Sequence, residues 1–424
     1  MAPMQPDAFD HSSRISIGEG AEFMDEILIE MTSLGSVVIA MFGAAFCLMQ
    51  TRHTRVSRSF ATFLAAIALN NIPDAFTQLL SGAPTSYTSV AAFITWPSSF
   101  FLAPLFWLYV SVLTSPHQEM PKRLAWHFAL PVAAIVTALL VLLSPPMVRD
   151  TLFSQDPVIE TGWMMTLAVL IGLLQITLLP QIAIYLILIF RRLLRFRIQL
   201  RDVYSSTERH ELRWIYVIGS LCALFWLAAT LLLIGTLRLG DAPPSFLIFV
   251  SIEGFVLVCA VTLWGIRQRP PLAPDRQEEA LQTKSQPSGK YEKSALSPEA
   301  SARLSRKLRN AMEVDHLHRD ANLSLWTLAR HIGASSNHVS QTLNEVIGGS
   351  FFDFVNSYRI AEAKTLLSTT EDSVLNITYD VGFNARSSFY NAFKRHTGQT
   401  PTAYRKDLSQ RDGVDDFKGQ LRDT

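Results

Sequence analysis

Seven long apolar segments dominate the first two thirds of this 424-residue chain. A helix needs about 20 mostly apolar residues to cross a bilayer, because each residue rises about 1.5 Å through roughly 30 Å of hydrocarbon. Only 17% of the residues are charged, whereas soluble domains carry about 25%. The segments therefore predict a membrane domain over residues 32–267. They cover roughly residues 32–50, 59–80, 89–113, 125–145, 163–190, 213–236 and 245–266.

The basic residues between these segments are sorted by side. Fourteen Lys and Arg residues fall in the connections on one side of the predicted membrane and three on the other. Lys and Arg concentrate in cytoplasmic loops. We therefore expect residues 1–31 outside and the C-terminus inside the cell. Helices buried in a large soluble core are the alternative, but they do not explain the sorted charge.

No pattern in the chain indicates catalysis or cofactor binding. The three cysteines (Cys47, Cys222 and Cys259) all lie inside apolar segments and lack metal-ligand spacing. Metalloprotease, nucleophile-elbow, phosphate-loop and kinase motifs do not occur. We expect no cofactor, no metal and no enzymatic activity.

The composition changes after the last apolar segment. Residues 268–295 are rich in Pro, Gln, Ser and charge, which predicts a flexible linker. Residues 296–406 have helical periodicity, beginning at Ser297 with Pro298 as a first helical residue. Residues 407–424 are expected to be disordered. The predicted fold class is all-α: a seven-helix membrane bundle followed by a soluble helical domain with two helix-turn-helix units.

Two helix-turn-helix patterns repeat about fifty residues apart, joined by one long amphipathic helix that we expect near residues 351–368. In each pattern, two apolar helix faces flank a glycine. The first has Leu325, Leu328, Ala329 and Ile332 before Gly333, and Val339, Leu343 and Val346 after it. The second has Ile377 and Val381 before Gly382, and Phe389 and Phe393 after it.

The segments "RIAEAKTLL" and "VGFNARSSFYNAFKRHTGQTPTAYR" resemble, in content and order, the DNA-binding domain of AraC/XylS-type bacterial transcription regulators. The resemblance covers about 110 residues. Two residues depart from the family pattern: Thr378, where Ala is usual, and Asn391, where a basic residue is common. The membrane part is similar to the seven-span sensor fused to some of these regulators, through "APLFWLYVSVLT" at 103–114, His127 and Pro131.

The resemblance implies two recognition helices that enter successive major grooves of double-stranded DNA. A helix fits the major groove, where Asn and Gln suit adenine and Arg suits guanine. The implied groove-facing residues are Ser336, Asn337, Ser340 and Gln341 in the first unit, and Arg386, Ser387, Tyr390 and Asn391 in the second. Lys394, Arg395 and Arg405 are expected to hold phosphates.

Ionisable residues inside membrane segments indicate functional sites by default. Asp74 and Glu253 lie at similar expected depths below the outer surface, with Asn70 beside Asp74 and Arg238 near the outer end of the sixth segment. The hypothesis is a polar pocket for a small-molecule or envelope signal. The alternative is that both acids only satisfy neighbouring helices or interfacial water.

The sequence thus predicts a one-component transcription regulator in the bacterial inner membrane, with lipid and DNA as partners. We expect it to act as a homodimer, because such regulators gain affinity by pairing modules on repeated sites. Two alternatives stay open. The membrane part is a transporter or intramembrane enzyme with an autoregulatory tail, or it is a passive anchor.

Overall fold

The computed structural model describes residues 8–51, 53–77, 79, 84–115, 119–121, 123–154, 159, 161–206, 212–239, 244–268, 272, 296–408 and 410. Every element in this part of the chain is helical, apart from an isolated bridge between Tyr204 and Ser324. The all-α class is therefore confirmed for the described residues. Nearly all of the predicted linker and C-terminal tail lies outside them.

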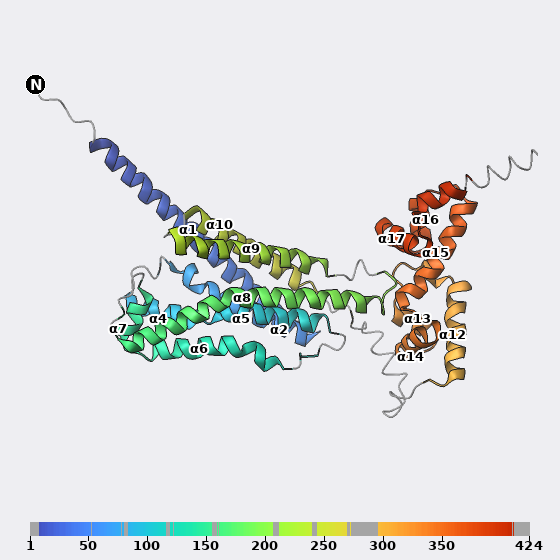
Figure 1. Ribbon diagram of the computed structural model, residues 1–424, viewed down its shortest axis with the longest axis horizontal. Helices are drawn as coiled ribbons and strands as arrows, with labels where there is room; N and C mark the ends of the chain where they lie inside the picture. Colours follow the sequence, from blue (N-terminus) through green and yellow to red (C-terminus); the bar gives the residue numbers. More distant parts are fainter. Residues whose placement is uncertain are drawn as a thin grey trace, which may run out of the picture. The chain divides into compact units, whose positions relative to one another are not determined.

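The chain forms two compact units. The first contains residues 1–193 and 212–270, and the second contains residues 194–211 and 271–424. The elements of the first unit (Figure 1) are α1 (Ala8–Met49), α2 (Thr54–Ala75), α4 (Thr85–Thr95), α5 (Ser98–Leu113), η1 (Leu124–Phe128), α6 (Ala129–Leu142), α7 (Pro146–Phe153), α8 (Gly162–Leu200), α9 (Arg213–Leu239) and α10 (Pro244–Gly265). The last residues of α8 are counted in the second unit.

Five described helical stretches are long and apolar enough to cross a membrane, by length and composition alone. They are Met24–Met49, Tyr87–Leu113, Leu124–Leu142, Gly162–Leu200 and Phe246–Gly265. A shorter apolar stretch covers Ile215–Leu231 within α9. Helix α2, which matches the second predicted segment, is not among the five. The count of seven spans therefore stays a prediction.

The third apolar segment contains two helices. Helix α4 ends at Thr95 and α5 begins at Ser98, with Pro97 between them. Proline has no backbone N–H to donate and clashes with the preceding turn, so it interrupts the helical hydrogen-bond ladder. Pro104, by contrast, lies within α5 without ending it.

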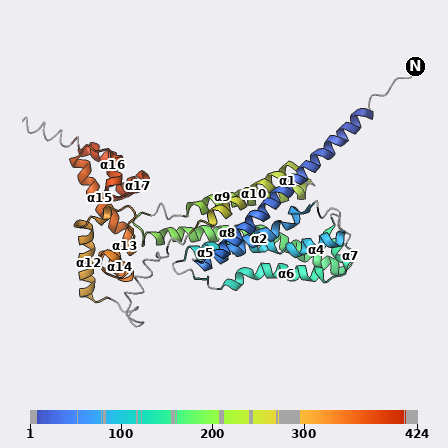
Figure 2. The same ribbon diagram turned by 180° about the vertical axis from the view of Figure 1, so that it is seen from behind.

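Helices α1 and α10 lie side by side in both views (Figures 1 and 2), and small residues let them approach closely. A Cβ atom on Gly35 would lie 2.7 Å from the Phe255 ring, and one on Gly43 would lie 2.6 Å from the Thr262 side chain. Larger residues at these two positions would push the helices apart.

The second unit contains two helix pairs joined by a long helix. Its elements are α12 (Pro298–Glu313), η2 (Leu317–Arg319), α13 (Leu325–His331), α14 (Ser336–Thr342), η3 (Leu343–Ile347), α15 (Phe351–Thr369), α16 (Val374–Asp380) and α17 (Arg386–Thr397). Ser297, Ser324, Ser335, Ser350 and Ser373 each cap the helix that follows by accepting a hydrogen bond from a backbone N–H.

Helix α15 contributes to two separate hydrophobic cores. Its first turns, including Phe351 and Val355, pack with α12, α13 and α14. Its later residues, including Ile360 and Leu367, pack with α16 and α17. The long predicted helix over 351–368 therefore matches α15 closely, and it joins the two helix pairs through shared packing.

The turn between α16 and α17 lies close to η2. Gly382 has φ +92°, and a Cβ atom on it would lie 2.5 Å from the His318 carbonyl oxygen. A residue with a side chain would meet both backbone strain and a direct clash. Glycine is therefore required here for two independent reasons.

One predicted core residue is exposed. The side chain of Val346 is 50% exposed, whereas Val339 and Leu343 are buried as expected. After Thr342 the chain continues as a π-helical turn, which advances the register. Ile347 packs against the core in place of Val346.

Candidate nucleic-acid interface

Helix α14 presents a polar face beside its buried core residues. Asn337 is exposed, and Ser336, Ser340 and Gln341 are partly exposed. The Gln341 side-chain amide donates to a Glu345 carboxylate oxygen at 3.0 Å. All four residues implied by the family resemblance thus reach the surface on one short helix.

Helix α17 carries the second polar face. Arg386, Ser387, Asn391 and Lys394 are exposed and Tyr390 is partly exposed, while Phe389 and Phe393 anchor the opposite side with no exposed surface. The helix begins after Ala385, which provides no side-chain cap. Its first backbone N–H groups therefore have no capping side chain, and such helix ends favour anions such as phosphate.

Arg386 and Tyr390 form a preorganised pair, one helical turn apart. The Arg386 guanidinium lies 4.9 Å from the centre of the Tyr390 ring and donates to the phenol oxygen at 3.0 Å. The Tyr390 hydroxyl also lies 3.1 Å from that of Thr402. The hydrogen bond with Thr402 lowers the pKa of Tyr390 and outweighs the opposing effect of burial, with Arg386 acting in the same direction. The pair restricts the rotamers of Arg386 before any ligand arrives.

Two of the three expected phosphate contacts already have protein partners. Arg395 donates to the Asp353 Oδ1 atom at 3.0 Å. Arg405 donates to the carbonyl oxygens of Asp372 at 2.7 Å and Leu367 at 3.4 Å. Of the three, Lys394 is the residue for which no side-chain contact appears in the described part. The role of all three toward phosphate stays a prediction.

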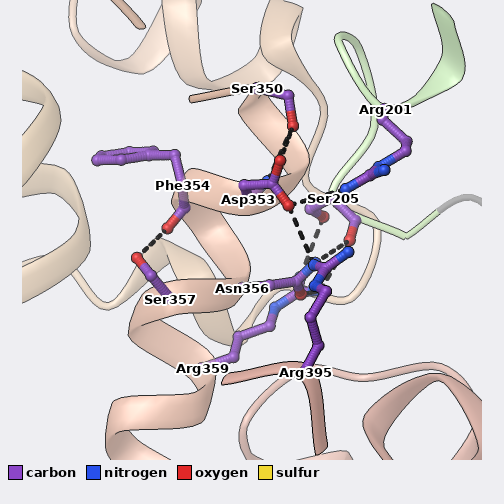
Figure 3. Close-up of polar contacts among 9 residues, drawn as sticks. All are labelled: Arg201, Ser205, Ser350, Asp353, Phe354, Asn356, Ser357, Arg359 and Arg395. Carbon is purple, nitrogen blue, oxygen red and sulfur yellow. Dashed lines mark hydrogen bonds and ion pairs between the residues drawn. The ribbon is translucent and has the colours of Figure 1, made fainter. Parts of the chain in front are cut away.

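Asp353 is a residue that the sequence analysis missed. Its carboxylate also accepts from Ser350 at 2.7 Å and from Arg201 at 2.9 Å (Figure 3). The spacing of Ser350 and Asp353 indicates only the start of a helix. The two arginine partners come from distant parts of the sequence, so no local pattern could have identified them.

An ion network connects η2, which lies between α12 and α13, to α15. Glu362 accepts from His318 at 2.7 Å and pairs with Arg319. Burial raises the pKa of Glu362, but hydrogen bonds from Arg319 and His318 outweigh it and hold this pKa below its ordinary value. Glu362 belongs to the "RIAEAKTLL" segment, so part of that motif holds the domain together.

The predicted ligand-binding residues of the first unit occupy different environments. Asn70 accepts from Ser99 at 2.6 Å and from Ser98 at 3.3 Å, which links α2 to α5. Asp74 is exposed near the end of α2. Both carboxylate oxygens of Glu253 in α10 are buried, with no hydrogen-bond partner among the described residues. The Arg238 side chain lies outside the described part.

A polar aromatic cluster also lies in this domain. The His127 ring stacks on the Trp107 ring at 4.0 Å between centroids, and its Nδ1 atom lies 2.9 Å from the Tyr185 hydroxyl. Trp107 belongs to the "APLFWLYVSVLT" segment. No described interaction joins this cluster, Asp74 and Glu253 into one site.

Comparisons with known proteins concern the C-terminal domain. Residues 328–407 match the family described as a helix-turn-helix domain. The chain is 36% identical over 101 residues to an uncharacterized HTH-type transcriptional regulator of Staphylococcus aureus (strain COL), covering 24% of this chain and 14% of that protein. It is 30% identical over 92 residues to the melibiose operon regulatory protein of Escherichia coli (strain K12), covering 22% of this chain and 30% of that protein.

A solved structure, the C-terminal domain of AraT, a response regulator from Geobacillus stearothermophilus, is 26% identical. That match covers 27% of this chain and 88% of that chain, with a TM-score of 0.23. This chain thus spans only 14% and 30% of the lengths of the two curated relatives. The sequence matches support a helix-turn-helix domain of the kind found in transcriptional regulators.

Proposed function

We propose that this protein is a membrane-embedded, one-component transcription regulator. Its C-terminal domain binds specific double-stranded DNA through two helix-turn-helix units, in response to a signal sensed by its membrane domain. One observation carries the proposal. Helix α15 belongs to two cores, each of which presents a short polar helix, α14 or α17, on a chain with five helices apolar enough to cross a bilayer.

The division of labour within each polar helix follows from its side chains. Arg386, Asn337 and Gln341 carry the fork-shaped groups that pair with base edges in the major groove. Lys394 is a flexible point charge, which suits phosphate. Base-reading residues give sequence preference, and phosphate contacts give general, salt-dependent affinity.

The test is a genome-wide map of DNA bound by the full-length protein in its native membrane. We expect discrete sites upstream of a small set of genes, with two contacted grooves on one face of each site. Uniform, sequence-independent occupancy would contradict the proposal. The genes next to the sites would also indicate the class of signal.

We further propose seven spans, with the N-terminus outside and the C-terminus in the cytoplasm of a bacterial inner membrane. The sorting of basic residues between the connections supports this topology. A compartment-specific reporter fused after Arg269 should report the cytoplasm, and a periplasmic result would contradict it.

The protein is proposed to act as a homodimer, paired through its spans. Crosslinking in membranes should then trap a dimer. Finding only monomer while target regulation remains intact would refute the pairing.

Signal sensing is proposed to involve Asp74 and Glu253, with Asn70 and Arg238 in support. The buried carboxylate of Glu253 supports this: it has no hydrogen-bond partner among the described residues, and a buried acid in a membrane segment is costly and by default indicates a functional site. Replacing Asp74 with Asn and Glu253 with Gln should abolish signal-dependent expression without affecting membrane insertion. Wild-type regulation in both variants would remove these residues from the sensing site.

A further inference from the structure

A short segment that follows helix α8 docks onto the DNA-binding domain. Residues 201–206 belong to the same compact unit as residues 271–424. Ser205 and Ser206 are buried in this unit, at 1% and 6% exposure. Figure 3 shows Ser205 and Arg201 facing the polar side chains of α15. A polar segment buried this deeply has a specific docking site.

The backbone of this segment satisfies the starts of two helices. Leu325, the first residue of α13, donates its N–H to the Val203 carbonyl at 2.8 Å. Phe352, in the first turn of α15, donates to the Arg201 carbonyl at 2.9 Å. The first N–H groups of a helix have no partner inside that helix. The segment therefore supplies acceptors that α13 and α15 lack on their own.

Arg359 of α15 binds the segment through its side chain. This side chain has no exposed surface. Its guanidinium donates to the Ser205 carbonyl at 3.3 Å, the Ser205 hydroxyl at 3.0 Å and the Ser206 hydroxyl at 3.1 Å. Ser205 also donates its N–H to the Leu323 carbonyl at 3.2 Å. Buried polar groups need such partners, so departure of the segment would remove three of the acceptors that the Arg359 guanidinium uses.

The docked segment and helix α17 share one ion-pair partner, the carboxylate of Asp353. The Asp353 Oδ1 atom accepts from Arg201 at 2.9 Å and from Arg395 of α17 at 3.0 Å. Both guanidinium groups lie over the Phe352 ring. When Arg201 is docked, Arg395 shares the negative charge of Asp353. When Arg201 leaves, Asp353 holds Arg395 alone and competes more strongly with DNA phosphate.

The connection between α8 and the docked segment is hydrogen-bonded throughout. Arg201 donates to the Ile198 carbonyl at 3.1 Å, and Tyr204 donates to the Leu200 carbonyl at 2.9 Å. No unbonded stretch separates the helix from the segment. The composition of residues 268–295, the last connection between the two units, predicts a flexible chain instead.

We propose that residues 201–206 are the coupling segment of this protein. The starts of α13 and α15, together with Arg359, form its docking site, and the state of α8 reaches the DNA-reading helices through it. This inference rests on the proposed function as a DNA-binding regulator. Docking of the segment corresponds to the DNA-competent state, because it loosens the hold of Asp353 on Arg395.

The test compares two insertions in the full-length protein, kept in its native membrane at equal abundance. Four residues, Gly-Ser-Gly-Ser, are inserted between Leu200 and Arg201, or between Ser285 and Gln286 in the linker. The first insertion should change DNA-site occupancy at least about fivefold, the lower end of usual allosteric coupling. The matched linker insertion should leave occupancy unchanged. An unchanged first variant, or an equal effect of both, would overturn the coupling role.

Hydrogen exchange on the full-length protein in lipid nanodiscs tests docking independently of DNA. The amides of Leu325 and Phe352 should be protected in the wild type and exchange faster in Ser205→Pro, which removes the N–H bonded to Leu323. Equal, fast exchange in both proteins would overturn the docking site. If the wild type bound no specific DNA, the proposed function would fail, and this exchange measurement would still decide the docking.

Discussion

Replacing Arg359 with Met should open the docking site of residues 201–206. Met keeps the apolar stem of the side chain and removes the guanidinium. The lost hydrogen bonds include those to the carbonyl oxygens of His318 at 2.7 Å and Asp320 at 2.8 Å, in addition to those to Ser205. The substitution therefore removes hydrogen-bond donors from acceptors in two other chain segments at once, residues 205–206 and residues 318–320.

The magnitude follows from what remains after the substitution. Removing the guanidinium also removes the cost of burying its charge, so the loss is set by the acceptors left behind. A buried polar group that loses its partner costs about 1–3 kcal/mol. Counting about three weakened acceptors, each near the lower end, gives a loss of about 3 kcal/mol. Since about 1.4 kcal/mol is a factor of ten, local opening should become roughly a hundredfold more frequent.

Hydrogen exchange of the full-length protein in nanodiscs measures this opening at the amides of Leu325 and Phe352. Arg319→Met is the matched control, because the Arg319 side chain is half exposed, whereas that of Arg359 is fully buried. Ion pairs made by such exposed side chains contribute about 0–1 kcal/mol, so the control should accelerate exchange less than about tenfold. Equal acceleration in the two variants would refute the reasoning that burial of the Arg359 network sets its strength.

Three further outcomes are expected. Arg386→Ala should weaken the preference for specific DNA more than the general affinity for DNA. Lys394→Ala should do the reverse and make binding less dependent on salt. Equal losses on specific and random DNA in Arg386→Ala would show that Arg386 does not read bases. Arg201→Ala should lower DNA affinity up to about fivefold because Asp353 then holds Arg395 alone. The control Arg195→Ala, at an exposed position of the preceding helix α8, should not lower it, as titration by fluorescence anisotropy would show. Because the pKa of Glu362 is lowered in the folded domain, its stabilisation is complete above its unfolded pKa of about 4.3 and is lost as the pH falls through the lower folded value. Hydrogen exchange of the DNA-binding domain should show this acid sensitivity in the wild type and not in Glu362→Gln.

Local patterns predicted much of the DNA-binding domain. Periodicity placed Leu328, Val339, Phe389 and Phe393 in the cores, where all four are buried. These predictions succeeded because each helix is short and its apolar face follows a regular spacing. The predicted burial of Val346 was wrong because a π-helical turn changes the spacing of the buried residues. No residue type in the segment indicates such a turn.

Contacts between residues far apart in the chain could not be predicted from the sequence. Arg201 reads as one of many basic residues that mark a cytoplasmic loop, and its pairing with Asp353 depends on the folded domain. Arg359 lies in the motif that carries the family resemblance, but the sequence does not reveal that Ser205 completes its hydrogen bonds. The candidate residues for base and phosphate contacts stay predictions, because no described contact tests them.

The chain passes between the apolar helices and the DNA-binding domain three times: within α8, just before α9 and after α10. The composition of residues 268–295 predicts a flexible linker, and such a chain limits only how far the domain can move, because it transmits almost no torque. The segment of residues 201–206 is continuous with α8 and is held at Leu325, Phe352 and Arg359. A coupling free energy requires contacts that differ between two states. The contacts of residues 201–206 are candidates for such a difference, which supports our proposal that the signal passes through α8 and this segment.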